Sequence, residues 1–350
     1  MVYYIIVGVF FILCMCNVIS KFKTIYLEFL LLIVLIFLSA FRSHEVGADT
    51  LVYLMFFEKI PSLLNFNSDI FSHIEIGFRV FIAAIKTFTS SNEFFLFLCT
   101  VICFLPMYVG LKKLRLPYIL IGLFFYFLIF YINYPNSVIR QGISMSLFIL
   151  SLPYMLKRDT SKVLILSFIS FLFHSTGFIV LLCYIFVSLS YRRAFLITIF
   201  FSILSIILYK FGALQYLIFN YWKPDYEQVY TETFVESTSF FQYLYRVIIV
   251  FLIGFFILKV NNEFYKKIFL FYVIGFLIYI SLSDNNLLAA RFNMFFRILE
   301  VALIPYVLSC VVGFKSRAFV FFIFFIVFFA FFVQAENIPY NQYSFNSDYF

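Results

Sequence analysis

The sequence contains too little charge for a soluble protein of its size. Only 12% of its 350 residues are charged, whereas 65% are hydrophobic and 24% are aromatic. A soluble domain cannot bury that much apolar surface in a single core. Apolar stretches close to the roughly 20 residues that a helix needs to cross the hydrocarbon layer recur along the whole chain. The sequence therefore predicts an all-α, polytopic integral membrane protein, organised as one multi-pass membrane domain over residues 1–350.

Cations are missing in front of the first apolar segment, Met1 to Ser20, and Lys21 and Lys23 follow it. A cleaved signal peptide carries its positive charge in front of the apolar region. The order found here instead predicts a first transmembrane helix whose C-terminal end is cytoplasmic.

The sequence also lacks the motifs of nucleotide-binding, nucleic-acid-binding and disulfide-rich proteins. The sequence has no glycine-rich phosphate loop and no separate soluble nucleotide-sugar domain. Its net charge of +8 is spread over short clusters and forms no basic face, so we expect no nucleic-acid partner. All six cysteines lie in apolar segments, where a free cysteine behaves as a small hydrophobe. We expect no disulfide framework, no cofactor and no metal ion.

The cations between the apolar stretches predict the topology. If each stretch crosses once and Val163 to Ser190 splits into two short helices at His174, the chain crosses about 12 times with both termini outside. Short cytoplasmic loops then carry most of the cations and only Asp159 and Glu263 as acids, as the positive-inside rule requires. The cytoplasmic cations are Lys21, Lys23, Lys112, Lys113, Arg115, Lys157, Arg158, Lys162, Arg192, Arg193, Lys259, Lys266, Lys267, Lys315 and Arg317.

Two long outer loops follow from this topology, at residues 42–77 and 212–239. The short apolar segment Phe78 to Thr89 contains Arg79 and Lys86. We expect it to lie along the outer interface, because a crossing there would turn the basic cluster 112–115 outward.

The first outer loop begins with the polar segment 42–53, which directly follows the apolar run Thr24 to Phe41. It places Arg42 and Asp49 at a membrane boundary, with Gly47 free to bend the backbone between them. The alternative is an ordinary solvated loop. Other polar segments on the same side are Glu75–Phe78, Asn133–Gln141, His174–Gly177, Asp284–Arg297 and Pro339–Tyr340.

Five arginines lie at or near the outer ends of the predicted helices. An arginine at that depth normally faces a cavity or a partner rather than lipid, although each one alone could be a snorkelling anchor. Together they predict an outward-facing cavity that binds an anion. These residues are Arg42, Arg140, Arg246, Arg291 and Arg297.

Taken in order, the polar segments resemble the EpsG family of Wzy-type polysaccharide polymerases. The resemblance rests on Arg42, Gly47-x-Asp49-Thr50-x-x-Tyr53, Glu75-x-Gly77-Phe78, Asn136-x-x-x-Arg140-Gln141, Phe173-His174-Ser175, Arg291 with Phe295, and Pro339-Tyr340. The turn after His174 departs from the family, because it reads Ser-Thr-Gly where a Ser-Ser pairing is associated with that position.

The resemblance implies a glycosyltransferase of the bacterial inner membrane, with its active site facing the periplasm. Such an enzyme joins oligosaccharide repeat units in O-antigen, capsule or exopolysaccharide biosynthesis. Donor and acceptor would both be oligosaccharides linked to undecaprenyl diphosphate, and the other partners would be membrane lipid and a chain-length regulator protein. A nucleotide site is not needed, because the activated sugar arrives on a lipid.

This chemistry suggests roles by residue type. A diphosphate leaving group must be neutralised, and guanidinium groups suit that best, so we choose Arg42, Arg140 and Arg291. An acceptor hydroxyl needs a base, for which Asp49 ranks before Glu75 and His174. In the alternative interpretation, Glu75 orients an arginine, and Asp49 and His174 cap helices. The expected supporting residues are Gly47, Thr50, Tyr53, Asn136, Gln141, Arg246 and Arg297.

Two other function classes share the pattern. A lipid-linked glycan transporter or flippase also has about 12 helices and intramembrane charges, but usually shows internal repeats, and none is visible here. An O-antigen ligase or a surface-glycan acyltransferase would share the outward site and the histidine.

Overall fold

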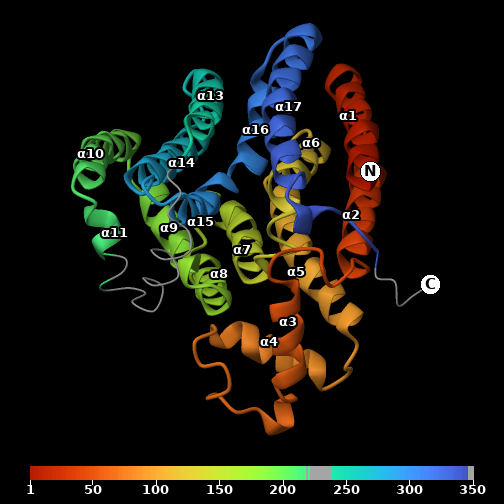
Figure 1. Cartoon of the computed structure of the whole chain (residues 1–350). Coiled ribbons are helices and arrows are strands. Elements are labelled where there is room, and N and C mark those ends of the chain that lie inside the picture. The colour runs from red at the N-terminus through yellow and green to blue at the C-terminus, as the bar shows by residue number, and fades with distance from the viewer. Residues whose placement is uncertain (218–219, 221–237, 346–350) are drawn as a thin grey trace. The chain divides into compact units, whose positions relative to one another are not determined.

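The computed structural model describes residues 1–217, 220 and 238–345, which are helical over most of their length (Figure 1). This confirms the all-α fold class. The helices group into two compact units: Met1–Leu181 with Ile304–Phe350, and Leu182–Leu303. The single membrane domain over residues 1–350 stays a prediction.

Seven helices of the described residues are long and apolar enough to cross a membrane, as expected of a multi-pass membrane protein. They are α1 (Val2–Ser20), α5 (Asn92–Lys113), α7 (Ile139–Leu156), α10 (Tyr191–Lys210), α13 (Phe240–Ile257), α14 (Glu263–Ser281) and α17 (Phe314–Glu336).

A further set of helices is apolar but shorter, so the number of about 12 crossings stays a prediction. This set comprises α2 (Ile25–Ala40), α6 (Ile119–Tyr126) with its π-helical continuation η2 (Phe127–Tyr131), α8 (Thr160–Phe173), the 3-10 turn η3 (Ser175–Phe178) with α9 (Ile179–Ser188), and α16 (Glu300–Cys310).

The predicted break at His174 is confirmed. Helix α8 ends at Phe173, and His174 has an extended backbone with φ of −157° and ψ of 133°. The chain then restarts at Ser175 as η3.

The segment from Arg291 to Val312, which the predicted topology counts as one crossing, is not one continuous helix. Helix α15 (Asn286–Arg297) ends before α16 begins at Glu300. At the junction the hydrogen bonds tighten, and the Leu299 N–H donates to the Phe296 carbonyl at 3.1 Å. Arg297 and Glu300 flank this turn, but charged residues in an apolar segment do not by themselves indicate where a helix ends.

The segment predicted as outer loop 42–77 contains α3 (Thr50–Lys59) and the short turn η1 (Leu63–Asn65), and α4 (Ile76–Lys86) follows. At 11 residues, α4 is too short to cross the hydrocarbon layer by itself. It runs across the direction of α1 and α17 (Figure 1).

The second predicted outer loop, 212–239, begins with α11 (Ala213–Leu217). Its acidic residues Asp225, Glu227, Glu232 and Glu236 lie outside the described residues. At the other end of the chain, α17 is followed by the 3-10 turn η5 (Pro339–Asn341).

Candidate active site

Three element starts meet in the first unit. Glu75 is the N-cap residue of α4, Arg140 lies in the first turn of α7, and Ser175 begins η3. The Arg140 guanidinium forms an ion pair with one oxygen of Glu75, and the Ser175 N–H donates to the other at 3.2 Å. The side chains of Arg140 and Glu75 are 22% and 15% exposed, so this pair remains accessible to a ligand.

Gly77 explains how α4 approaches α8 closely enough to form this group. A Cβ atom at Gly77 would lie only 2.6 Å from the Leu172 carbonyl oxygen. Since real Cβ atoms do not come that close to backbone atoms, only glycine permits this contact. The contact brings Glu75 to the end of α8, where His174 and Ser175 follow.

The charge of Glu75 is set by its neighbours. Burial raises the pKa of its carboxyl, but Arg140, His174 and the Ser175 N–H together lower it further, so the net pKa lies below the ordinary value. Glu75 is therefore ionised at neutral pH and is a weak base. The structure favours the interpretation in which it orients Arg140.

Tyr53 and Asp49 join the same group from α3. Burial raises the pKa of the Tyr53 hydroxyl, while the neighbouring Arg140, which bonds to it, lowers that pKa and the Asp49 carboxylate raises it. The Tyr53 ring packs edge-on against Phe78, with ring centroids 5.4 Å apart. We call Asp49, Tyr53, Glu75, Arg140 and His174 the Glu75–Arg140 cluster.

Asp49 stands at the N-cap position of α3, as the capping alternative predicts, but its half-buried side chain does not cap the helix. The capping alternative is thus not observed for this carboxylate, which instead lies near Tyr53.

His174 does act as a cap. Its Nδ1 accepts the Thr176 N–H at 3.3 Å and lies 2.7 Å from the Thr176 hydroxyl. Because Nδ1 accepts a hydrogen bond, the proton of the neutral ring is assigned to Nε2. In this state His174 offers a donor to the cluster rather than a base.

Arg42 lies elsewhere in the first unit and is 1% exposed. Its Nε donates to the Val46 carbonyl at 3.2 Å, and its Nη1 donates to both the carbonyl and the hydroxyl of Ser39. Its Nη2 donates to Thr50 Oγ1 and to the Asn136 carbonyl, both at 3.2 Å. These bonds use all five guanidinium N–H groups. The predicted diphosphate contact of Arg42 stays a prediction, and the bonds observed favour a structural role.

Gly47 lies in the same group of contacts. We call Ser39, Arg42, Val46, Gly47, Thr50 and Asn136 the Arg42 clamp. The φ of Gly47 is +92°, and a Cβ atom would lie 2.1 Å from the Asn136 carbonyl oxygen. Its N–H donates to the Tyr340 carbonyl at 2.7 Å, and the neighbouring Ala48 N–H donates to Ser137 Oγ at 3.1 Å. The structure thus brings the segments 42–53, 133–141 and 339–340 together. Gln141 is buried on α7 next to Arg140 in sequence.

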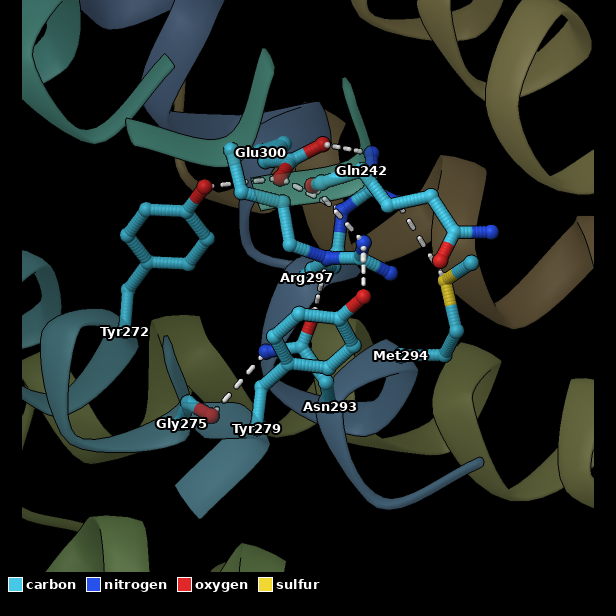
Figure 2. Close-up of polar contacts among 9 residues, drawn as sticks. Gln242, Tyr272, Gly275, Tyr279, Asn293, Met294, Arg297 and Glu300 are labelled. Atoms are coloured by element: carbon cyan, nitrogen blue, oxygen red, sulfur yellow. Dashed lines mark hydrogen bonds and ion pairs between the residues drawn. The ribbon is translucent and has the colours of Figure 1, made fainter. Parts of the chain in front are cut away.

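A separate arginine network lies in the second unit (Figure 2). Arg297 forms a two-bonded ion pair with Glu300, at 2.9 and 3.2 Å, and Tyr272 donates to the same carboxylate at 2.8 Å. Arg246 donates to Tyr279 at 2.6 Å and to Asn293 Oδ1 at 3.2 Å. The network thus holds two buried guanidinium groups and one buried carboxylate, which pairs with Arg297, so it has an excess of positive charge.

Glu300 and its partner Tyr272 were not predicted from the sequence. One signal was present in the sequence, because an acid three residues after an arginine can form a local ion pair with it. Arg291 lies on α15, also in the second unit, and is partly buried. Its role at a diphosphate stays a prediction.

His44, the histidine of the first polar segment, lines a cavity of about 440 Å³ together with Leu51, Glu58 and Lys86. In the described parts of the chain, no group of three or more His, Cys, Asp and Glu side chains could hold a metal ion.

Comparison with known protein families gives a match over most of the chain. The sequence model of the EpsG family matches residues 25–345, from the first residue of α2 to the β-bridge that Phe345 forms with Arg42. No curated protein and no solved structure matches the chain. The family match includes every residue of the Glu75–Arg140 cluster, of the Arg42 clamp and of the second-unit network, and on this evidence the chain belongs to the EpsG family, a Wzy-type polymerase-like family.

Proposed function

We propose that this protein is a polysaccharide polymerase that transfers an oligosaccharide from an undecaprenyl-diphosphate donor to a lipid-linked acceptor, at the outer face of the bacterial inner membrane. The proposal extends the family assignment to a substrate class and a location. The observation that carries it is the Glu75–Arg140 cluster, in which a partly exposed guanidinium at the start of α7 lies near two carboxylates, at the starts of α3 and α4.

Arg140 is the residue that we assign to the diphosphate leaving group. Its ion pair with Glu75 fixes the direction of the guanidinium, and its remaining exposure lets a phosphate oxygen approach. Charge that develops on the leaving oxygen is stabilised most by donors already held in place. Arg291 keeps its predicted role toward a diphosphate, with Arg246 and Arg297 as supporting residues, whereas Arg42 positions the loop that carries Asp49.

Asp49 is the residue that we propose as the base. Glu75 is held in its ionised form by Arg140, and the Nδ1 of His174 is occupied by Thr176. Asp49 would take the proton of the acceptor hydroxyl while that oxygen forms a bond to the anomeric carbon. The bond from this carbon to the diphosphate breaks in the same step, and the lipid diphosphate leaves as an anion.

The test uses the purified full-length protein, incubated with lipid-linked single repeat units. We expect a ladder of longer lipid-linked chains with the wild-type protein and with Asp69→Asn, a control at an exposed aspartate of the same outer segment. Asp49→Asn should lower the rate by about 10²–10⁴-fold, the usual contribution of a general base. Transfer to a different acceptor would indicate a ligase, and no new glycosidic bond would indicate a transporter. Either result would overturn the proposal.

A further inference from the structure

We infer that the first unit holds a second anion site, which binds the phosphate of an anionic membrane lipid. The site is a cavity of about 450 Å³ between the α1–α2 connection and the α5–α6 connection. It lies at the N-terminal end of α2, and the Arg42 clamp lies at the C-terminal end. With 16 residues at about 1.5 Å each, α2 separates the two by roughly 24 Å. The inference is therefore independent of the proposed reaction.

The cavity has an excess of positive charge. Its lining includes Lys21, Lys23 and Lys112 and one acid, Glu28. The Glu28 carboxylate is 3% exposed, forms an ion pair with Lys112 at 2.7 Å and accepts the Thr24 hydroxyl at 2.7 Å. Within the described residues, neither Lys21 nor Lys23 has a carboxylate partner, so both can face an anionic ligand.

Two helix starts reinforce this charge. The cavity is lined by Ile25, the first residue of α2, and by Ile119, the first residue of α6. Neither N-cap side chain, Thr24 or Tyr118, caps its helix. Uncapped N–H groups and the positive end of the helix dipole both favour a bound anion.

Asn17 supplies an independent sign of a ligand. This residue lines the cavity and is 3% exposed, and its Nδ2 donates to the Phe22 carbonyl at 2.9 Å. Its Oδ1 is buried and has no hydrogen-bond partner among the described residues. Since buried polar atoms are normally bonded, the Asn17 Oδ1 is free to accept a hydrogen bond from a ligand in the cavity. A glycerol phosphate headgroup offers both the anion for the lysines and a hydroxyl for this oxygen.

The surroundings favour a lipid over free phosphate. Phe22 and Ile25 line the cavity and are also exposed on the outside of the bundle, next to exposed Tyr26 and Phe29. Such side chains contact acyl chains when the helices lie in a membrane. A phosphate in the cavity could therefore keep its lipid tails in the bilayer, as in basic pockets between transmembrane helices.

The experiment measures thermal unfolding of the full-length protein in a phosphate-free maltoside detergent. Dioleoyl phosphatidylglycerol, dioleoyl phosphatidylcholine and inorganic phosphate are titrated separately. A ligand that binds the folded state raises the unfolding midpoint in proportion to its affinity. We expect phosphatidylglycerol to raise the midpoint at the lowest concentration. For the double variant Lys21→Gln with Lys23→Gln, about thirtyfold more lipid should be needed, because two cations near an anionic headgroup are lost.

Two controls separate the cavity from general surface charge. Lys157→Gln with Arg158→Gln removes two exposed cations outside the cavity and should respond like the wild type. Lys21→Arg with Lys23→Arg keeps the charge and should retain most of the binding. Equal losses in both glutamine variants would overturn the inference, and so would equal effects of the two lipids. A midpoint shift by inorganic phosphate at the same concentration as phosphatidylglycerol would indicate a free-phosphate site and overturn the lipid assignment.

Discussion

Arg42 and Arg140 lie in the same unit and were predicted to bind the same diphosphate, but their surroundings differ. Arg42 is 1% exposed, and protein oxygens accept bonds from all five of its N–H groups. The Arg140 side chain is 22% exposed and is paired with a carboxylate that is itself partly open. The difference shows that the role of an arginine at the membrane boundary depends on how many of its N–H groups already donate hydrogen bonds within the protein.

The largest effect is expected for Arg42→Ala, which should lower the free energy of unfolding by about 3–5 kcal/mol. The substitution leaves the buried Ser39 carbonyl without its side-chain donor, and the Val46 and Asn136 carbonyls with only the single proton of the Thr50 hydroxyl between them. Each buried group that loses its partner costs about 1–3 kcal/mol. Thermal unfolding of the purified protein measures this change. If the variant had normal stability but formed no polymer, Arg42 would be a substrate-binding residue rather than a structural one.

Gly47→Ala tests the same clamp through its backbone and should cost about 2–4 kcal/mol, because it combines left-handed strain with a clash at Asn136. Gly212→Ala is the matched control, since Gly212 also has a positive φ, of +59°, but open space around it. Thermal unfolding should show a clearly smaller loss for this control. Similar losses would mean that the contact with Asn136 is unimportant.

Arg140→Ala should leave the protein folded but lower the rate of polymer formation by about a hundredfold or more, the usual cost of losing one preorganised donor. Arg140→Lys should also be impaired, because an ammonium group cannot reproduce the planar fork. The rate of ladder formation at equal protein levels measures both. Near-normal rates in the alanine variant would make Arg140 a membrane anchor.

Glu75→Gln tests whether Glu75 orients Arg140 or acts as the base. We expect this variant to lose about tenfold in polymerisation rate. A glutamine can still accept the Ser175 N–H but holds Arg140 without a charge-assisted bond. The loss should therefore be smaller than for Asp49→Asn. If the glutamine variant were the more damaged of the two, Glu75 would be the better candidate for the base.

The smallest effect concerns pH. The pKa of Glu75 lies below its ordinary value of 4.5 in the folded protein, so Glu75 contributes stability above about pH 4.5. That contribution is lost as the pH falls through the lower folded-state pKa. Unfolding midpoints of the wild type and Glu75→Gln should therefore converge as the pH falls below about 4.5. A constant difference over this range would show that the ion pair does not stabilise the fold.

The sequence predicted much of the secondary structure. Apolar runs located helices such as α1, α2 and α7 to within a few residues, because membrane insertion depends on the hydropathy of consecutive side chains. The break at His174 was predicted for a similar reason, since the run was too long for one crossing. The turn at Leu299 was not, because its cause is local backbone hydrogen bonding, which the hydropathy of the segment does not report.

The sequence predicted which residues belong to the candidate site, but not which of them contact one another. The order of the motifs indicated that Glu75, Arg140 and His174 belong to one family pattern. It gave no sign that Ser175 bonds to Glu75 or that Glu300 pairs with Arg297, since these partners depend on which helix starts meet.

The sequence by itself determined that this protein is a multi-pass helical membrane protein with polar segments at defined positions. The reason is that the free energy of inserting a helix into a membrane is the sum of contributions from consecutive side chains. Only the tertiary structure decided what each arginine does. Whether a guanidinium is available depends on acceptors that lie far away in the chain, such as Asn136 for Arg42 and Glu75 for Arg140. Their proximity is created by packing, such as the close approach of α4 to α8 that Gly77 allows.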